Sequence, residues 1–105
     1  MPWFHIPTYF LAGALFANFV PHFVSGVLGR RFPTPFASPP FRGLSSSRVN
    51  VVYGLCNLAL AYALLWHVGN FDPKIALHGG VFGLGLSVWS LMISRSLARR
   101  QEEQV

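Results

Sequence analysis

The sequence predicts an all-α membrane protein in which three transmembrane helices form a small bundle. Two observations carry this prediction: 52% of the 105 residues are hydrophobic and only 10% are charged. An ordinary soluble domain has about 25% charged residues, and a soluble chain of this length buries too little surface to hide so many apolar side chains. We therefore expect one integral membrane domain over residues 1–105.

Three apolar segments are long enough to be membrane spans: residues 3–28, 49–68 and 75–93. Each approaches or exceeds the ~20 residues that cross a hydrocarbon layer of about 30 Å. The first segment has no basic region before it, so it is predicted to be a retained span and not a signal peptide. Residues 29–48 then form a loop between spans, and residues 94–105 form a basic tail.

The positive charges predict the orientation of the spans. All but Lys74 of the eight Lys and Arg residues lie in the loop or the tail: Arg30, Arg31, Arg42, Arg48, Arg95, Arg99 and Arg100. The positive-inside rule then places the N-terminus outside and the C-terminus in the cytoplasm. We expect residence in the bacterial inner (plasma) membrane. The net charge of +5 forms no basic face of a folded domain, so the lipid bilayer and not nucleic acid is the expected partner.

The loop combines proline, phenylalanine and arginine. Its four prolines exclude a regular helix, and its phenylalanines are too apolar for a solvated linker. One interpretation is an extended segment on the inner membrane surface, with Phe rings in the bilayer and Arg heads on anionic lipid. The other is a docking strip for another subunit. The residues concerned are Arg30, Arg31, Phe32, Phe36, Phe41 and Arg42.

Polar side chains recur inside the spans with helical spacing. They are Asn18, His22, Ser25, Asn50, Asn57, Ser87 and Ser90. At 1.5 Å per residue, Asn18, Asn57 and Ser87 all lie about 12–15 Å from the loop-side end of their spans. We therefore expect the three polar faces to turn toward one another as an intramembrane seam.

Small residues share these faces and predict where the helices pack. In lipid, helices associate where small side chains let the backbones approach closely. Gly79 and Gly83 have the GxxxG spacing, and Gly13–Ala17 and Ser25–Gly29 are similar pairs. The expected packing positions are Gly13, Ala17, Gly29, Gly54, Gly79 and Gly83.

Two prolines affect the course of the chain. The ring of Pro21 crowds the carbonyl of Ala17, which predicts a kink in the first span. Pro73 lies with Asn70 and Asp72 in a short turn. That turn predicts that the second and third spans are antiparallel neighbours.

The histidines are the candidate ligands. His22 lies within the first span and is a candidate axial ligand for a haem or chlorin. No second histidine is expected at its depth, because His5, His67 and His78 all fall toward the outer side. These three form a candidate outer metal or proton site, although their spacing matches no established zinc pattern. No resident metal or other cofactor is predicted.

No catalytic signature is present, so the chain is not expected to be an enzyme. It lacks GxSxG, HExxH, P-loop and GxGxxG patterns, and its only acids are Asp72, Glu102 and Glu103. The preferred hypothesis is an accessory or assembly subunit that binds other membrane subunits or copies of itself. The alternatives are a homo-oligomeric channel or small-solute carrier, and a haem- or pigment-binding electron-transfer subunit. The channel would be lined by Asn18, His22, Asn50, Asn57 and Ser87.

Overall fold

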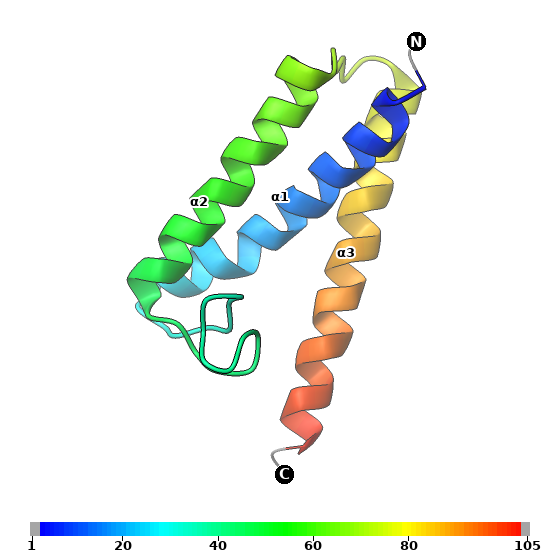
Figure 1. Ribbon diagram of the computed structural model, residues 1–105. Coiled ribbons are helices and arrows are strands. Elements are labelled where there is room, and N and C mark those ends of the chain that lie inside the picture. The colour runs from blue at the N-terminus through cyan, green and yellow to red at the C-terminus, as the bar shows by residue number, and fades with distance from the viewer. Residues whose placement is uncertain (1–2, 104–105) are drawn as a thin grey trace.

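The structure, a computed structural model, describes residues 3–103 and is all-helical. Helix α1 spans His5–Val27, α2 spans Ser47–Ala63 and continues into the π-helical turn η1 (Leu64–Val68), and α3 spans Ala76–Glu103 (Figure 1). Three segments are long and apolar enough to cross a membrane: α1, α2 together with η1, and α3. The prediction of three apolar helices is confirmed.

Local signals explain where α1 ends and α2 begins. The amide of Arg30 donates to the Ser25 carbonyl (2.8 Å) and that of Gly29 to the Gly26 carbonyl (3.0 Å), while Gly29 has φ +75°. This is the Schellman arrangement, in which glycine ends a helix in the left-handed conformation. Gly29 is therefore a helix-ending residue, which corrects its predicted role in packing. At the start of α2, the Ser46 hydroxyl accepts a hydrogen bond from the Val49 amide (3.2 Å) and caps the helix.

Helix α1 is the centre of the molecule. It packs against both α2 and α3, whereas the backbones of α2 and α3 do not pack against each other. In Figure 1, α2 and α3 diverge downward from residues 69–75, with α1 between them. The prediction that the second and third spans are neighbours is therefore wrong. We call the end with the start of α1 and residues 69–75 the turn end, and the end with residues 28–46 and the last turns of α3 the loop end.

The buried side chain of Tyr9 explains why α2 and α3 separate. Its hydroxyl accepts a hydrogen bond from the Asn70 amide (3.0 Å), and its ring centroid lies 5.3 Å from that of Phe71 and 4.7 Å from that of His78. Tyr9 also packs with Ala61 and Leu65 in the hydrophobic core. The connection from η1 to α3 thus folds around a residue of α1, which holds the two outer helices on different sides of α1.

Glycines allow α1 to approach its neighbours, but not all at the predicted positions. A methyl group at Gly13 of α1 would overlap the Phe82 carbonyl of α3, and one at Gly85 of α3 would overlap the Phe10 carbonyl. Ala17 of α1, another predicted packing position, is buried. Gly54 of α2 approaches Phe23, whose amide nitrogen would lie 3.0 Å from an added Cβ. Two of the contact glycines, Gly13 and Gly54, were expected from the sequence.

The predicted pair Gly79 and Gly83 does not form the α1–α3 contact. An added Cβ at Gly83 meets nothing within 4 Å, and at Gly79 it meets only the Pro73 carbonyl at 4.0 Å. The contact lies instead on the face of α3 that carries Phe82 and Gly85. Because successive helical residues are about 100° apart, Gly83 and Gly85 point in nearly opposite directions.

The loop between α1 and α2 is compact. Phe32 and Ser45 form a β-bridge through two backbone hydrogen bonds (3.3 and 3.0 Å). Inside it, the Thr34 carbonyl accepts from the amides of Ala37 and Phe41 (3.1 and 2.9 Å), and Thr34, Ala37 and Ser45 are buried. The expectation of an extended segment is wrong, because these bonds close the loop on itself.

Two further expectations concern the course of α1 and the length of α3. Helix α1 is continuous across Pro21, and the kink there stays a prediction. Helix α3 continues through most of the segment expected to be a tail. Its 28 residues reach about 42 Å at 1.5 Å per residue, which exceeds a hydrocarbon layer of about 30 Å. Arg95, Arg99 and Arg100 therefore lie on a helix that is longer than one crossing requires.

Two glycines of α3 give a matched test of this packing. Gly85→Ala should lower the free energy of unfolding by about 1–3 kcal/mol, because the methyl group overpacks the contact with α1. Gly80→Ala, where an added Cβ meets nothing within 4 Å, should be neutral or stabilising by up to about 1 kcal/mol. Unfolding by SDS in mixed micelles, followed by circular dichroism, measures both. Equal destabilisation by the two variants would contradict the contact described.

Candidate functional site

The most polar buried region lies at the loop end, where Asn50 of α2 meets α1 and the loop. Asn50 is fully buried (0% exposed). Its Nδ2 donates to the carbonyls of Phe32, Ser45 and Ser46 (3.1, 3.3 and 3.0 Å), and its Oδ1 lies 2.8 Å from Nδ1 of His22. Because three carbonyls fix the orientation of the amide, Oδ1 accepts, and Nδ1 of His22 carries the proton. One side chain thus connects α1, α2 and both ends of the loop.

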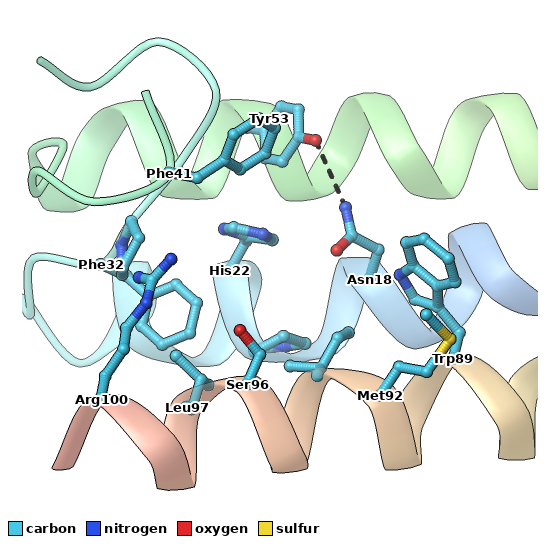
Figure 2. Close-up of a pocket in the computed structure, with 13 residues that line it drawn as sticks. Asn18, His22, Phe32, Phe41, Tyr53, Trp89, Met92, Ser96, Leu97 and Arg100 are labelled. Atoms are coloured by element: carbon cyan, nitrogen blue, oxygen red, sulfur yellow. Dashed lines mark hydrogen bonds between the residues drawn. The ribbon is translucent and has the colours of Figure 1, made fainter. Parts of the chain in front are cut away.

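A second cluster lies one turn farther from the loop end. Nδ2 of Asn18 donates to Oδ1 of Asn57 (3.1 Å) and to the Tyr53 hydroxyl (3.4 Å; Figure 2). Nδ2 of Asn57 donates to the Tyr53 carbonyl (2.8 Å). The Tyr53 ring also contacts His22 edge-on, with centroids 4.7 Å apart. Both clusters therefore form one continuous polar contact between α1 and α2, which we call the α1–α2 polar contact.

The structure brings together some of the predicted polar residues and separates others. Asn18, His22, Asn50 and Asn57 lie in the α1–α2 polar contact. Ser87 and Ser90 are exposed on α3 and lie outside the α1–α2 polar contact. Ser90 borders a hollow between α3 and α1. Ser25 is half-buried on α1, and its hydroxyl takes no part in either cluster. The expected three-helix seam is thus a two-helix contact.

Sequence reasoning missed four participants in this region: Phe32, Ser45, Ser46 and Tyr53. Tyr53 lies three residues after Asn50 and four before Asn57, a spacing that places it on the same helical face. That signal was available in the sequence. Phe32, Ser45 and Ser46 contribute their backbone carbonyls. Since every residue has a backbone carbonyl, the residue type does not reveal this role.

A cleft of about 270 Å³ opens beside the α1–α2 polar contact. Asn18, Pro21 and His22 of α1 line it, together with Tyr53 of α2 and residues of the loop and of α3 (Figure 2). The loop and α3 contribute Phe32, Pro33, Phe41, Trp89, Met92, Ile93, Ser96, Leu97 and Arg100. Most of these side chains are apolar, so the cleft has a hydrophobic wall in which a few side chains carry polar groups.

The outer histidines do not form the expected three-residue site. His5 and His78 both contact the Tyr9 ring, with centroid distances of 5.5 and 4.7 Å, and line one hollow with Asp72. Nδ1 of His78 accepts from the Asp72 amide (3.0 Å). His67 is exposed on η1 and contacts Tyr62. Between residues 3 and 103 no three His, Cys, Asp or Glu side chains are grouped to hold a metal ion. His67 is separated from the other two because the π-helical turn directs it outward.

His22 has one ring nitrogen engaged. Since Nδ1 donates to Asn50, only Nε2 is left for a haem or chlorin. The other three histidines all lie toward the turn end, on residues 5, 67 and 78. A haem with two histidine ligands from one chain would therefore need His22 and a histidine of the turn end, and the helices hold these side chains apart.

Comparison with known proteins gives no match. No protein-family model matches the chain, and no curated protein or solved structure is similar to it. The case for a function therefore depends on the geometry of the three helices and of the cleft.

The His22–Asn50 pair can be tested by a double-mutant cycle. Asn50→Leu should lower the free energy of unfolding by about 1–3 kcal/mol, because it leaves the buried Nδ1 of His22 without a partner and removes the amide that joins the loop to α2. His22→Phe should cost less in the Asn50→Leu background than in the wild type, with a coupling of about 0.5–3 kcal/mol. Additive effects would contradict the pairing.

Limited trypsinolysis reports on the loop in the same variants. Arg42 is exposed within the loop, and its cleavage should accelerate in Asn50→Leu, because the loop loses the amide that joins its ends. Asn70→Leu is the matched control, since Asn70 is exposed at the turn end. Equal cleavage rates in the two variants would show that Asn50 does not hold the loop.

Proposed function

We propose that the protein is a non-enzymatic integral membrane protein that serves as an accessory or assembly subunit of a larger membrane complex. In this proposal it crosses the membrane three times, with its N-terminus outside and its C-terminus in the cytoplasm. The basic residues support that orientation, because all but Lys74 belong to the loop end. Helix α3 is the element that binds the neighbouring subunit.

One observation carries the proposal: on the small-residue face of α3, no part of residues 3–103 packs on the glycines, and only Ser90 and Ser94 border a hollow beside α1. Five small residues recur at spacings of three and four and therefore share one face: Gly80, Gly83, Ser87, Ser90 and Ser94. We call this face the α3 stripe. An added Cβ at Gly80 or Gly83 meets nothing within 4 Å, and the three serines are exposed.

The α3 stripe has the composition of a helix–helix interface. In lipid, small side chains let two backbones approach, and serine hydroxyls donate hydrogen bonds to the facing helix. A helix surrounded only by acyl chains gains nothing from either property. Since α1 packs on the opposite face of α3, through Gly85, the α3 stripe is available to a transmembrane helix of another subunit or of a second copy.

The polar side chains of the site support a non-enzymatic role. Asn18, His22, Asn50 and Asn57 are hydrogen-bonded to one another or to the backbone. Among residues 3–103, every buried side-chain nitrogen and oxygen has a hydrogen-bond partner. Groups that satisfy one another in this way stabilise a helix contact and leave little capacity for acid–base chemistry.

The two alternative functions receive less support from the same geometry. A channel lined by Asn18, His22, Asn50, Asn57 and Ser87 would need these side chains on one surface, but Ser87 lies on the α3 stripe and the other four lie between α1 and α2. A haem subunit would need a second ligand near His22. We therefore prefer the subunit hypothesis to both.

A photo-crosslinking residue at position 87, in protein produced at its native level in its native membrane, tests the proposal. The expected result is one discrete adduct, whose mass identifies either another subunit or a second copy. The double variant Gly83→Leu, Ser87→Leu should reduce the fraction of protein that co-purifies as a complex in mild detergent by about tenfold, because two large side chains separate the backbones.

Ala59→Leu is the matched control, since it enlarges an exposed small residue of α2 away from the α3 stripe. It should leave the complex intact. Purification of the wild-type protein as a monomer alone, with no adduct at position 87, would overturn the proposal. An equal loss of complex in the control and the double variant would show that the α3 stripe is not the interface.

A further inference from the structure

Two hollows adjoin each other at the loop end, on the side of α3 that faces the loop. The first is the cleft of about 270 Å³ described above. The second, of about 560 Å³, is lined by Arg42 of the loop and by Arg95, Arg99 and Arg100 of α3. Met92, Ser96 and Arg100 line both. The two hollows therefore form one continuous site, apolar at one end and strongly basic at the other.

Among the side chains that the structure describes, residues 3–102, none supplies a counter-charge to the four arginines of the second hollow. No carboxylate of residues 3–102 lines either hollow, and within that range these guanidinium groups make no hydrogen bond or ion pair with another side chain. Asp72 belongs to the turn end, and the exposed Glu102 lines neither hollow. Since arginine stays charged at any physiological pH, the cluster repels itself until an anion binds.

Only some of the arginines at the loop end belong to this site, so the site differs from a general excess of positive charge. Arg30, Arg31 and Arg48 belong to the same end but line neither hollow. Arg42 is brought to α3 by the closed loop, which also places Phe32 and Phe41 in the cleft wall. Phe41 has φ +64°, a backbone conformation that is rare for an aromatic residue. The loop thus holds both an apolar wall and a basic group of the site.

We infer that this continuous site binds an anionic phospholipid of the leaflet at the loop end. Guanidinium groups bind phosphate oxygens in pairs, and basic pockets beside transmembrane helices bind anionic headgroups. The lipid phosphate lies among Arg42, Arg99 and Arg100, and the first part of an acyl chain lies against Trp89 and Leu97. A free phosphate ion has the same charge but no group that would occupy the apolar cleft.

This inference depends on membrane insertion but not on a partner subunit. The site lies on the face of α3 that carries Met92, Ser96 and Arg100, and the α3 stripe lies on another face. The two proposals can therefore fail separately, and the lipid site is tested with the full chain alone in nanodiscs.

The fluorescence of Trp89, which lines the cleft, provides the measurement. In a Trp3→Phe, Trp66→Phe background, Trp89 is the one tryptophan that remains of the three. Brominated phosphatidylglycerol and brominated phosphatidylcholine are compared as quenchers of its emission. The expected result is that the anionic lipid binds beside Trp89 with an apparent affinity about tenfold higher than that of the zwitterionic lipid. We call this difference the preference for the anionic lipid.

Two triple variants with the same loss of charge are compared in that background. Arg42→Gln, Arg99→Gln, Arg100→Gln should abolish the preference. The control Arg30→Gln, Arg31→Gln, Arg48→Gln should retain it, because those arginines lie outside the site. An equal loss of preference in both variants, or no preference in the parent protein, would overturn the inference in favour of general surface charge.

Two further measurements distinguish the lipid from a free anion. Ser96→Phe fills the junction of the two hollows at an exposed position, and it should reduce quenching by the anionic lipid to the level of the zwitterionic one. Excess inorganic phosphate should leave the preference in place. Full displacement by phosphate, or an unchanged preference in Ser96→Phe, would show that the site recognises the phosphate group alone and would overturn the lipid assignment.

Discussion

The hydrogen bonds of the buried Asn50 amide are the interaction on which the loop end depends. Its Oδ1 accepts from His22 of α1, and its Nδ2 donates to the carbonyls of Phe32, Ser45 and Ser46. A single interhelical hydrogen bond in a membrane protein contributes little net stability, about 0.6 kcal/mol on average. The contacts of this one side chain nevertheless determine a geometry, since the amide joins His22 of α1 to the backbone at both ends of the loop, and losing it leaves the buried Nδ1 of His22 without a partner. With the loop closed in this way, Phe32, Phe41 and Arg42 come to lie beside α3.

The central position of α1 gives the two other helices different environments. Helix α2 is held by polar groups as well as by the close approach at Gly54, whereas α3 meets α1 through Gly13 and Gly85. Because α2 and α3 do not pack on each other, a cleft stays open on one side of α3 and the α3 stripe stays uncovered on another. The two proposals, an anionic lipid in the cleft and a helix on the α3 stripe, follow from this one asymmetry.

Particular residues show how far sequence reasoning reached. Helical spacing and similar depth correctly placed Asn18 beside Asn57, because both properties follow from the rise and pitch of a helix. The same reasoning placed Ser87 with them, and there it was wrong, since depth and spacing do not specify how a helix is rotated about its axis. Gly29 was assigned to packing although its place at the end of α1 is typical of a Schellman glycine. Gly83 and Gly85 are both small, and only the contact with Phe10 and Phe82 distinguishes them.

The sequence by itself determined that three long apolar helices form, where they begin and where the first two end to within a few residues, and that basic residues gather at one end. These properties are local, since they follow from hydrophobicity, helix-ending residues and charge along the chain. The tertiary structure alone decided that α1 is central, that the loop closes on Asn50, and that Arg42 joins the arginines of α3. The physical reason is that each of these outcomes depends on the rotation and order of packed helices. Those are set by the fit of Tyr9, Gly13, Gly54 and Gly85 against distant backbone, and no periodicity along the chain encodes that fit.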